Sequence, residues 1–173
     1  MSSWLGLSVG IPLGIGLGAS YKALRPGASG WHSRLHKPKY NVPHSMLLPL
    51  FTALYTIEGV ATYLVSNEMV LGNSSNQETA VVVQAGHWGL AYYWLSLTFL
   101  VFWPALVASG PMYVKAAMAD ISLAVVLQLL ALVQFFRLST AGGLLHLLCF
   151  FVTHTLAVWN LALIQKSRAR LPL

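Results

Sequence analysis

Two acidic side chains interrupt long apolar stretches of the sequence, and they are the first candidates for chemistry. Glu58 and Asp120 each lie inside a run of apolar residues. Charge is costly in hydrocarbon, so each is expected to face a helix-bundle interior, a cavity or an interface. For Glu58 we expect a neutral carboxyl bonded to another helix, or else a contact with a ligand or a proton. For Asp120 we expect a structural role near the headgroups, beside Lys115 or the basic segment 25–44.

The histidines are the other residues that would suggest a reactive site. His32 and His36 are four residues apart, and His146 and His154 are eight apart. Neither pair has carboxylate or cysteine partners at a spacing typical of metal ligands. The single cysteine, Cys149, rules out a disulfide framework and is expected to be a small buried apolar residue. We therefore expect no metal, no cofactor and no catalytic residue in this chain.

Two tryptophans lie deep inside apolar runs rather than at their ends. Trp103 directly precedes Pro104, and Trp159 lies in the last apolar run. A proline inside a helix frees a carbonyl and bends the helix, which can open a gap in a bundle. Aromatic side chains around such a gap would suit a flat, apolar ligand.

The elements that hold these residues follow from the overall composition. The chain is 57% hydrophobic and 8% charged, whereas soluble domains carry about 25% charged residues. A fold of this length cannot hide so much apolar surface from water, so lipid must cover it. Five windows are apolar over the length of about 20 residues that a membrane span needs. They are 4–24, 45–66, 85–109, 112–136 and 144–165, and they predict one all-α integral membrane domain, a five-transmembrane-helix bundle, over residues 1–173.

The basic residues are distributed asymmetrically between the two ends of this bundle. With five spans, one side collects nine basic residues and the other collects only Arg137. The nine are Lys22, Arg25, Arg34, Lys37, Lys39, Lys115, Lys166, Arg168 and Arg170. This bias predicts that the first loop and the C-terminus are cytosolic. It also explains the net charge of +6 without nucleic acid as a partner.

The first window carries four glycines at an unbroken spacing of four residues. Gly6, Gly10, Gly14 and Gly18 share one helix face. Small residues allow the backbone of another helix to approach closely. We expect this face to pack against a neighbouring helix of the same chain. The alternative is a seam between two copies, which would make the protein a homodimer.

A specific pattern covers the first loop and the second window. Segment 31–65 reads WHSRLHKPKYNVPHSMLLPLFTALYTIEGVATYLV. It resembles the translocator protein (TspO, peripheral benzodiazepine receptor) family, whose patterns are W-Y-x-x-L-x-K-P-x-W-x-P-P, P-x-W-x-x-L-Y and G-x-x-x-Y-L-V. The residues that fall on these patterns are Trp31, Leu35, Lys37, Pro38, Pro43, Pro49, Leu54, Tyr55, Gly59, Tyr63, Leu64 and Val65. Tyr40 and Phe51 occupy aromatic places that the family fills with tryptophan.

The resemblance implies a pocket inside the helix bundle, capped by the first loop, for porphyrins, sterols such as cholesterol or similar flat ligands. The pocket residues it implies are Trp31, His44, Phe51, Trp103 and Asn160. His44 would donate a hydrogen bond to a carbonyl or carboxylate of the ligand. The chain departs from the family at Leu100, where the family has asparagine, and in the tryptophans that surround Asn160.

The resemblance also implies where the protein lies and what it does there. It implies a multi-pass protein of the mitochondrial outer membrane, or alternatively of the endoplasmic reticulum. The leading hypothesis is a non-enzymatic binding or transport protein. The alternatives are a membrane scaffold that works through helix contacts and an enzyme that degrades porphyrins.

Overall fold

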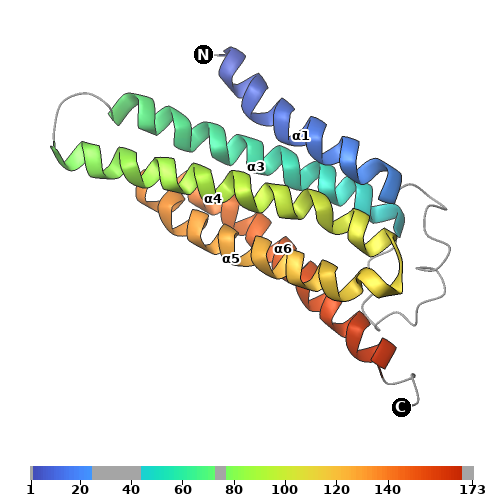
Figure 1. Cartoon of the computed structure of the whole chain (residues 1–173). Helices are drawn as coiled ribbons and strands as arrows, with labels where there is room; N and C mark the ends of the chain where they lie inside the picture. Colours follow the sequence, from blue (N-terminus) through green and yellow to red (C-terminus); the bar gives the residue numbers. More distant parts are fainter. Residues whose placement is uncertain (1, 25–43, 73–76, 169–173) are drawn as a thin grey trace.

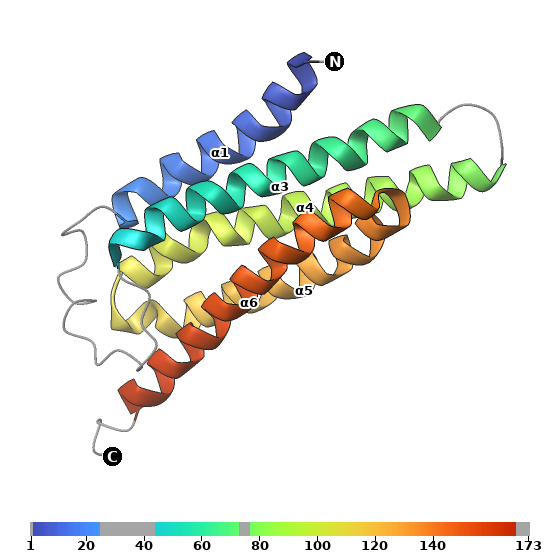
Figure 2. The same cartoon turned by 180° about the vertical axis from the view of Figure 1, so that it is seen from behind.

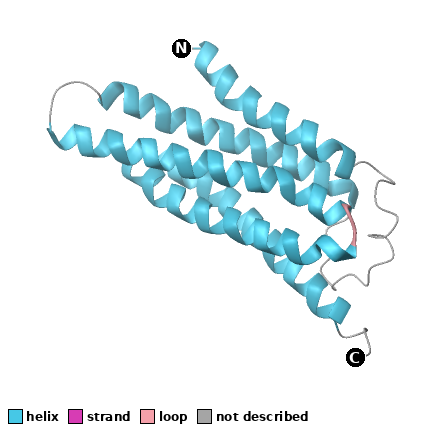
Figure 3. Ribbon diagram, in the orientation of Figure 1, coloured by secondary structure: helices cyan, strands magenta, loops and turns pink. Residues whose placement is uncertain are grey.

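The computed structural model describes residues 2–24, 44–72 and 77–168, and every regular element in them is a helix (Figures 1 and 3). The long helices are α1 (Ser2–Leu24), α3 (His44–Gly72), α4 (Gln77–Ala108), α5 (Val114–Leu138) and α6 (Thr140–Arg168). A short 3-10 turn, η1 (Pro111–Tyr113), precedes α5. The prediction of an all-helical membrane protein with five helices is confirmed.

Four of the helices are long and apolar enough to cross a membrane. Their apolar spans are Met46–Leu71, Val83–Ala108, Val114–Leu138 and Thr140–Gln165, and α1 contributes the shorter apolar stretch Leu5–Ala19. The helices extend beyond the predicted windows, most clearly where α4 begins at Gln77 rather than at 85. Hydropathy marks only the length that lies in hydrocarbon, and a helix can continue into the headgroup layer with polar residues.

A tight turn between the predicted windows 85–109 and 112–136 joins α4 to α5. Gly110 has a φ of 129°, a backbone conformation that favours glycine because it has no Cβ. The N–H of Tyr113 donates to the carbonyl of Gly110 over 3.1 Å. Two opposite views show that this turn lies at the same end of the bundle as the end of α1, the start of α3 and the end of α6 (Figures 1 and 2).

The distribution of polarity is the reverse of that in a soluble protein. On α5, large apolar side chains such as Leu123, Val126 and Val133 are exposed. The buried polar side chains are Glu58, Thr62, Ser96, Gln128, His146, Thr153 and Asn160. These polar side chains lie within a core that is otherwise mostly apolar, and lipid can cover the apolar exterior.

Helix α1 packs on α3 through close backbone contact at Gly59. A Cβ added to Gly59 would lie 2.6 Å from the carbonyl oxygen of Ser8 and 2.6 Å from the Cα of Val9. On α1, the buried residues of the contact face are Pro12 and Gly16. A glycine on α3, rather than one of the α1 series, therefore allows the two backbones to meet.

The glycine series of α1 faces away from the described helices. Gly6, Gly10, Gly14 and Gly18 are exposed, and among the described residues no atom lies within 4 Å of a Cβ added to any of them. The structure therefore corrects the expectation that this face packs against a neighbouring helix of the same chain. A spacing of four identifies a shared face, but it does not determine which neighbour that face meets. A homodimer seam on this face stays a prediction.

We predict that Gly59→Ala separates α1 from α3 and lowers the Tm of the detergent-solubilised protein. The new methyl group would meet backbone atoms, which cannot rotate aside, and overpacking of this kind costs about 1–3 kcal/mol. Gly10→Ala is the matched control, because its methyl group would meet no described atom and alanine favours a helix, so its Tm should not fall below that of the parent. Equal Tm values for the two variants would contradict the proposed contact.

Candidate functional site

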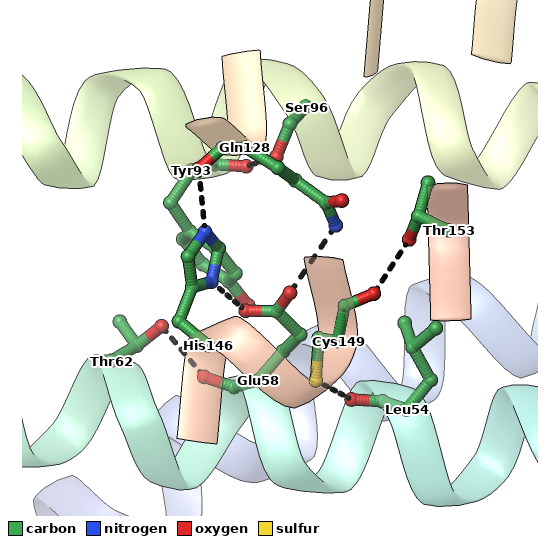
Figure 4. A network of polar contacts seen from close by, with 9 residues as sticks. All are labelled: Leu54, Glu58, Thr62, Tyr93, Ser96, Gln128, His146, Cys149 and Thr153. Atoms are coloured by element: carbon green, nitrogen blue, oxygen red, sulfur yellow. Dashed lines mark hydrogen bonds and ion pairs between the residues drawn. The ribbon is translucent and has the colours of Figure 1, made fainter. Parts of the chain in front are cut away.

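Three helices meet at a buried polar network in the middle of the bundle (Figure 4). Glu58 of α3 is 1% exposed and His146 of α6 is fully buried. The Oε2 atom of Glu58 lies 2.7 Å from Nδ1 of His146. From α5, Nε2 of Gln128 donates to Oε1 of Glu58 over 3.3 Å. Both carboxyl oxygens of the intramembrane acid therefore have partners from other helices, as the sequence hypothesis for Glu58 required.

The second nitrogen of the imidazole determines how many protons this pair holds. Nε2 of His146 lies 3.0 Å from the backbone carbonyl oxygen of Gln128. A carbonyl oxygen can only accept a hydrogen bond, so Nε2 must carry a hydrogen. One further proton then lies between Nδ1 of His146 and Oε2 of Glu58. The pair is either a carboxylic acid beside a neutral imidazole or a carboxylate beside an imidazolium, and its net charge is zero in both forms.

Aromatic rings and a thiol surround this pair and exclude water from it. The ring centroid of His146 is 4.9 Å from that of Phe135 and 6.5 Å from that of Tyr93. One turn along α6, the Sγ atom of Cys149 lies 3.8 Å from the carbonyl oxygen of Leu54 on α3. In such a low-dielectric setting a satisfied polar contact is strong, and an unsatisfied group is correspondingly costly.

The short connection between α5 and α6 brings two of these residues to the same depth. Ser139 joins the helices in an extended conformation, and its hydroxyl accepts a hydrogen bond from the N–H of Gly142 over 3.2 Å. This contact caps the start of α6. Gln128 precedes the connection and His146 follows it, so the antiparallel helices return the histidine to the level of the glutamine.

A second cluster, formed by the aromatic rings of Phe51, Trp103 and Trp159, lies further along the bundle. Phe51 of α3 stacks on Trp103 of α4 with ring centroids 6.0 Å apart and planes 20° apart. Trp103 contacts Trp159 of α6 edge to face, with centroids 6.3 Å apart. Tyr55 contacts Phe51 at 5.8 Å. This aromatic cluster therefore draws on α3, α4 and α6.

Two polar atoms of this region are buried without a hydrogen-bond partner among the described residues. They are the indole Nε1 of Trp103, a donor, and the amide Oδ1 of Asn160, an acceptor. The amide nitrogen of Asn160 has only the thioether of Met118 at 4.0 Å, which is a weak acceptor. Buried polar groups normally have partners, so these two atoms are exceptions within the described part of the chain.

The structure brings together some of the residues predicted as a site and not others. Phe51 and Trp103 are in stacked contact. Asn160, which follows Trp159 in the chain, is fully buried, and its amide nitrogen lies 4.0 Å from the thioether of Met118 on α5. Trp31 lies outside the described residues. His44 begins α3, but its side chain is outside the described part of the chain.

The second acidic residue does not have the partner expected for it. Among the described residues, Oδ2 of Asp120 is buried without a hydrogen-bond partner. Lys115 is exposed, and the ion pair found in the described ranges is that between Glu58 and His146. The expected pairing of Asp120 with Lys115 is therefore wrong, and segment 25–43 lies outside the described residues.

The sequence interpretation missed the partners of Glu58. It treated His146 only as a possible metal ligand, and it did not single out Gln128. Both ring nitrogens of His146 are engaged in hydrogen bonds, which leaves neither free for a metal ion. The signal that could have found them is their position, because each is a polar residue inside an apolar run of a helix.

We predict that His146→Leu lowers the stability of the folded protein strongly, because it leaves Glu58 buried without its closest partner. Breaking a buried pair in this way costs about 3–5 kcal/mol. The double variant Glu58→Met, His146→Leu should recover most of the loss, since it removes both groups. Thermal unfolding in detergent measures both effects. A double variant less stable than the single one would show that the pair is not an isolated coupled unit.

Comparison with known proteins agrees with this architecture. The chain matches the model of the TspO/MBR family over residues 8–165. No curated protein matches it in sequence. The match covers described parts of all five helices, including Glu58, His146 and the aromatic cluster. The helical membrane bundle agrees with a family match that covers most of the chain, and the chain belongs to the TspO/MBR family.

Proposed function

We propose that this protein binds porphyrins, sterols such as cholesterol, or similar flat apolar ligands at the aromatic cluster inside its helix bundle. Membership of the TspO/MBR family supports a role in binding. The observation that carries the proposal is the stacked contact of Phe51 and Trp103, whose indole nitrogen has no hydrogen-bond partner among the described residues. Oδ1 of Asn160 on α6 is a second buried atom of this kind. Stacked aromatic rings offer flat apolar surfaces, which match the shape and chemistry of such ligands.

The unsatisfied atoms indicate which polar groups the ligand would bring. The indole N–H of Trp103 needs an acceptor, and Oδ1 of Asn160 needs a donor. A hydroxyl group can satisfy both kinds of partner, and a carbonyl or carboxylate oxygen can satisfy the indole. His44 and Trp31 are proposed to complete the site from the loop side.

Binding or transport, rather than catalysis, is the activity that we propose. The strongest acid–base candidates, Glu58 and His146, are bonded to each other and to Gln128. These contacts occupy the carboxyl oxygens and the ring nitrogens that would act on a substrate. The same argument disfavours porphyrin degradation by this pair.

The protein is a multi-pass membrane protein, and we propose its orientation from charge. The ends of α1 and α6 and the α4–α5 turn lie together at one end of the bundle (Figures 1 and 2). The helix ends there carry Lys22, Lys115, Lys166 and Arg168, whereas Arg137 lies at the opposite end of α5. By the positive-inside rule this end would face the cytosol. The mitochondrial outer membrane is the proposed location, with the endoplasmic reticulum as the alternative.

Protoporphyrin should quench the tryptophan fluorescence of the purified protein saturably, and cholesterol should compete with it. Asn160→Leu should weaken binding about five- to tenfold, because it removes a buried hydrogen-bonding group worth about 1 kcal/mol. Thr155→Val on the same helix is the matched control, since Thr155 is exposed and its hydroxyl bonds only to the carbonyl of Phe151. Quenching that never saturates, with no competition by cholesterol, would refute the proposal.

A further inference from the structure

The Glu58–His146 pair and the aromatic cluster share two helices. On α3, Phe51, Tyr55 and Glu58 are spaced at i, i+4 and i+7, which places them on one face. Glu58 and Phe51 are therefore separated by about 10 Å along the helix axis. On α6, His146 and Asn160 both lie on the buried face. The two helices touch at the pair and at the contact of Cys149 with Leu54, and these contacts are called the α3–α6 seam below. At the cluster, Trp103 of α4 links Phe51 of α3 to Trp159 of α6.

The Glu58–His146 pair at this seam holds a fixed number of protons while the seam is closed. The geometry around His146 requires one titratable proton in the pair, and with it the net charge is zero. The other titratable groups around the pair, over all the described helices packed there, are Tyr93 of α4, Cys149 of α6 and Tyr55 of α3. All three are neutral in their ordinary protonated forms. From α5 the neighbour is the uncharged Gln128, and at this level α1 presents the backbone of Ser8 and Val9 to α3.

We propose that the Glu58–His146 pair is an intramembrane proton site that gates ligand exchange at the aromatic cluster. The seam stays closed while the pair holds one titratable proton, and it opens when the pair holds none or two. A net charge left in this buried position has no counter-ion among the described groups, so separation of α6 from α3, which admits water, relieves the penalty. The proposal rests on the proposed function in one respect, namely that the ligand occupies the cluster.

The pH dependence of the gate follows from proton counting. In water, the reference pKa values of glutamate and histidine side chains are about 4.3 and about 6.5, and we take these values for an open, water-filled seam. Between these two pKa values the open seam also holds one proton, so pH does not change the equilibrium between the closed and the open seam. Above about 6.5 the open seam holds fewer protons than the closed one, and rising pH favours opening about tenfold per pH unit. Below about 4.3 the open seam holds two protons, and falling pH favours opening.

Cys149 is an internal reporter of opening that requires no ligand. It is the single cysteine of the chain, it is 2% exposed, and it contacts Leu54 across the seam. In the full-length protein in lipid nanodiscs, its reaction with a neutral maleimide should accelerate about hundredfold per pH unit from 6.5 to 8. Opening and the thiolate fraction of the exposed cysteine each contribute about tenfold. A tenfold increase per pH unit in the parent protein would overturn the proposal.

Two variants test whether the Glu58–His146 pair causes this pH dependence of Cys149 labelling. Glu58→Gln retains a hydrogen-bonding partner for His146 but has no proton to lose, so its labelling should accelerate only about tenfold per pH unit. His146→Gln leaves a lone carboxyl. Opening should then become more favourable with rising pH above about 4.3 instead of above about 6.5, which speeds labelling at pH 7 about hundredfold. His154→Gln is the control, because His154 is exposed on α6 and should leave the parent profile unchanged. If Glu58→Gln does not fold, His146→Gln decides the question. Labelling of His146→Gln with the same pH dependence as the parent would refute the gate.

Ligand release separates the gate from the binding proposal. The dimethyl ester of protoporphyrin carries no carboxylates, and its release from the parent should accelerate about tenfold per pH unit from 6.5 to 8. Release from Glu58→Gln should be constant over this range. If neither the ester nor cholesterol binds while the labelling profile holds, the binding proposal fails and the proton site stands. If the ester binds but its release does not depend on pH, the gate is refuted and the binding proposal stands.

Discussion

The structure depends on the requirement that a polar group in hydrocarbon must find its partner within the protein. Glu58, His146 and Gln128 meet this requirement together, with contacts of 2.7 to 3.3 Å between three helices. No one of these helices could place its polar residue in the membrane interior alone without a large penalty. The network therefore constrains how α3, α5 and α6 pack, and it sets the depth at which they meet.

The same requirement explains the contrast between the two buried regions. In the polar network the carboxyl oxygens of Glu58 and both ring nitrogens of His146 have partners, although Oε1 of Gln128 has none among the described residues. Trp103 of the aromatic cluster and Asn160 of α6 each retain an unpaired atom among those residues. The first arrangement stabilises the closed bundle, and the second suits an additional molecule. Because α3 and α6 contribute to both, the strength of their contact bears on access to the cluster.

Much of the fold could be predicted from the sequence, because lipid imposes simple rules on length and hydropathy. The five helices and the interior position of Glu58 both follow from them. These rules do not predict which helices contact each other. The glycines of α1 share a face by their spacing, yet Gly59 on α3 makes the close contact, because periodicity does not encode which helix lies opposite. The partnership of Glu58 with His146 likewise joins residues 88 apart in sequence.

The central claim is that the pair holds one titratable proton in the closed bundle. Nitrogen-15 magnetic resonance of His146 in lipid bilayers tests this claim most directly, since it reports the protonation of each ring nitrogen. The account predicts that Nε2 carries a hydrogen and that both nitrogen signals of the closed state stay constant from pH 5 to pH 8. A ring that titrates near about 6.5, as a histidine in water does, would contradict it.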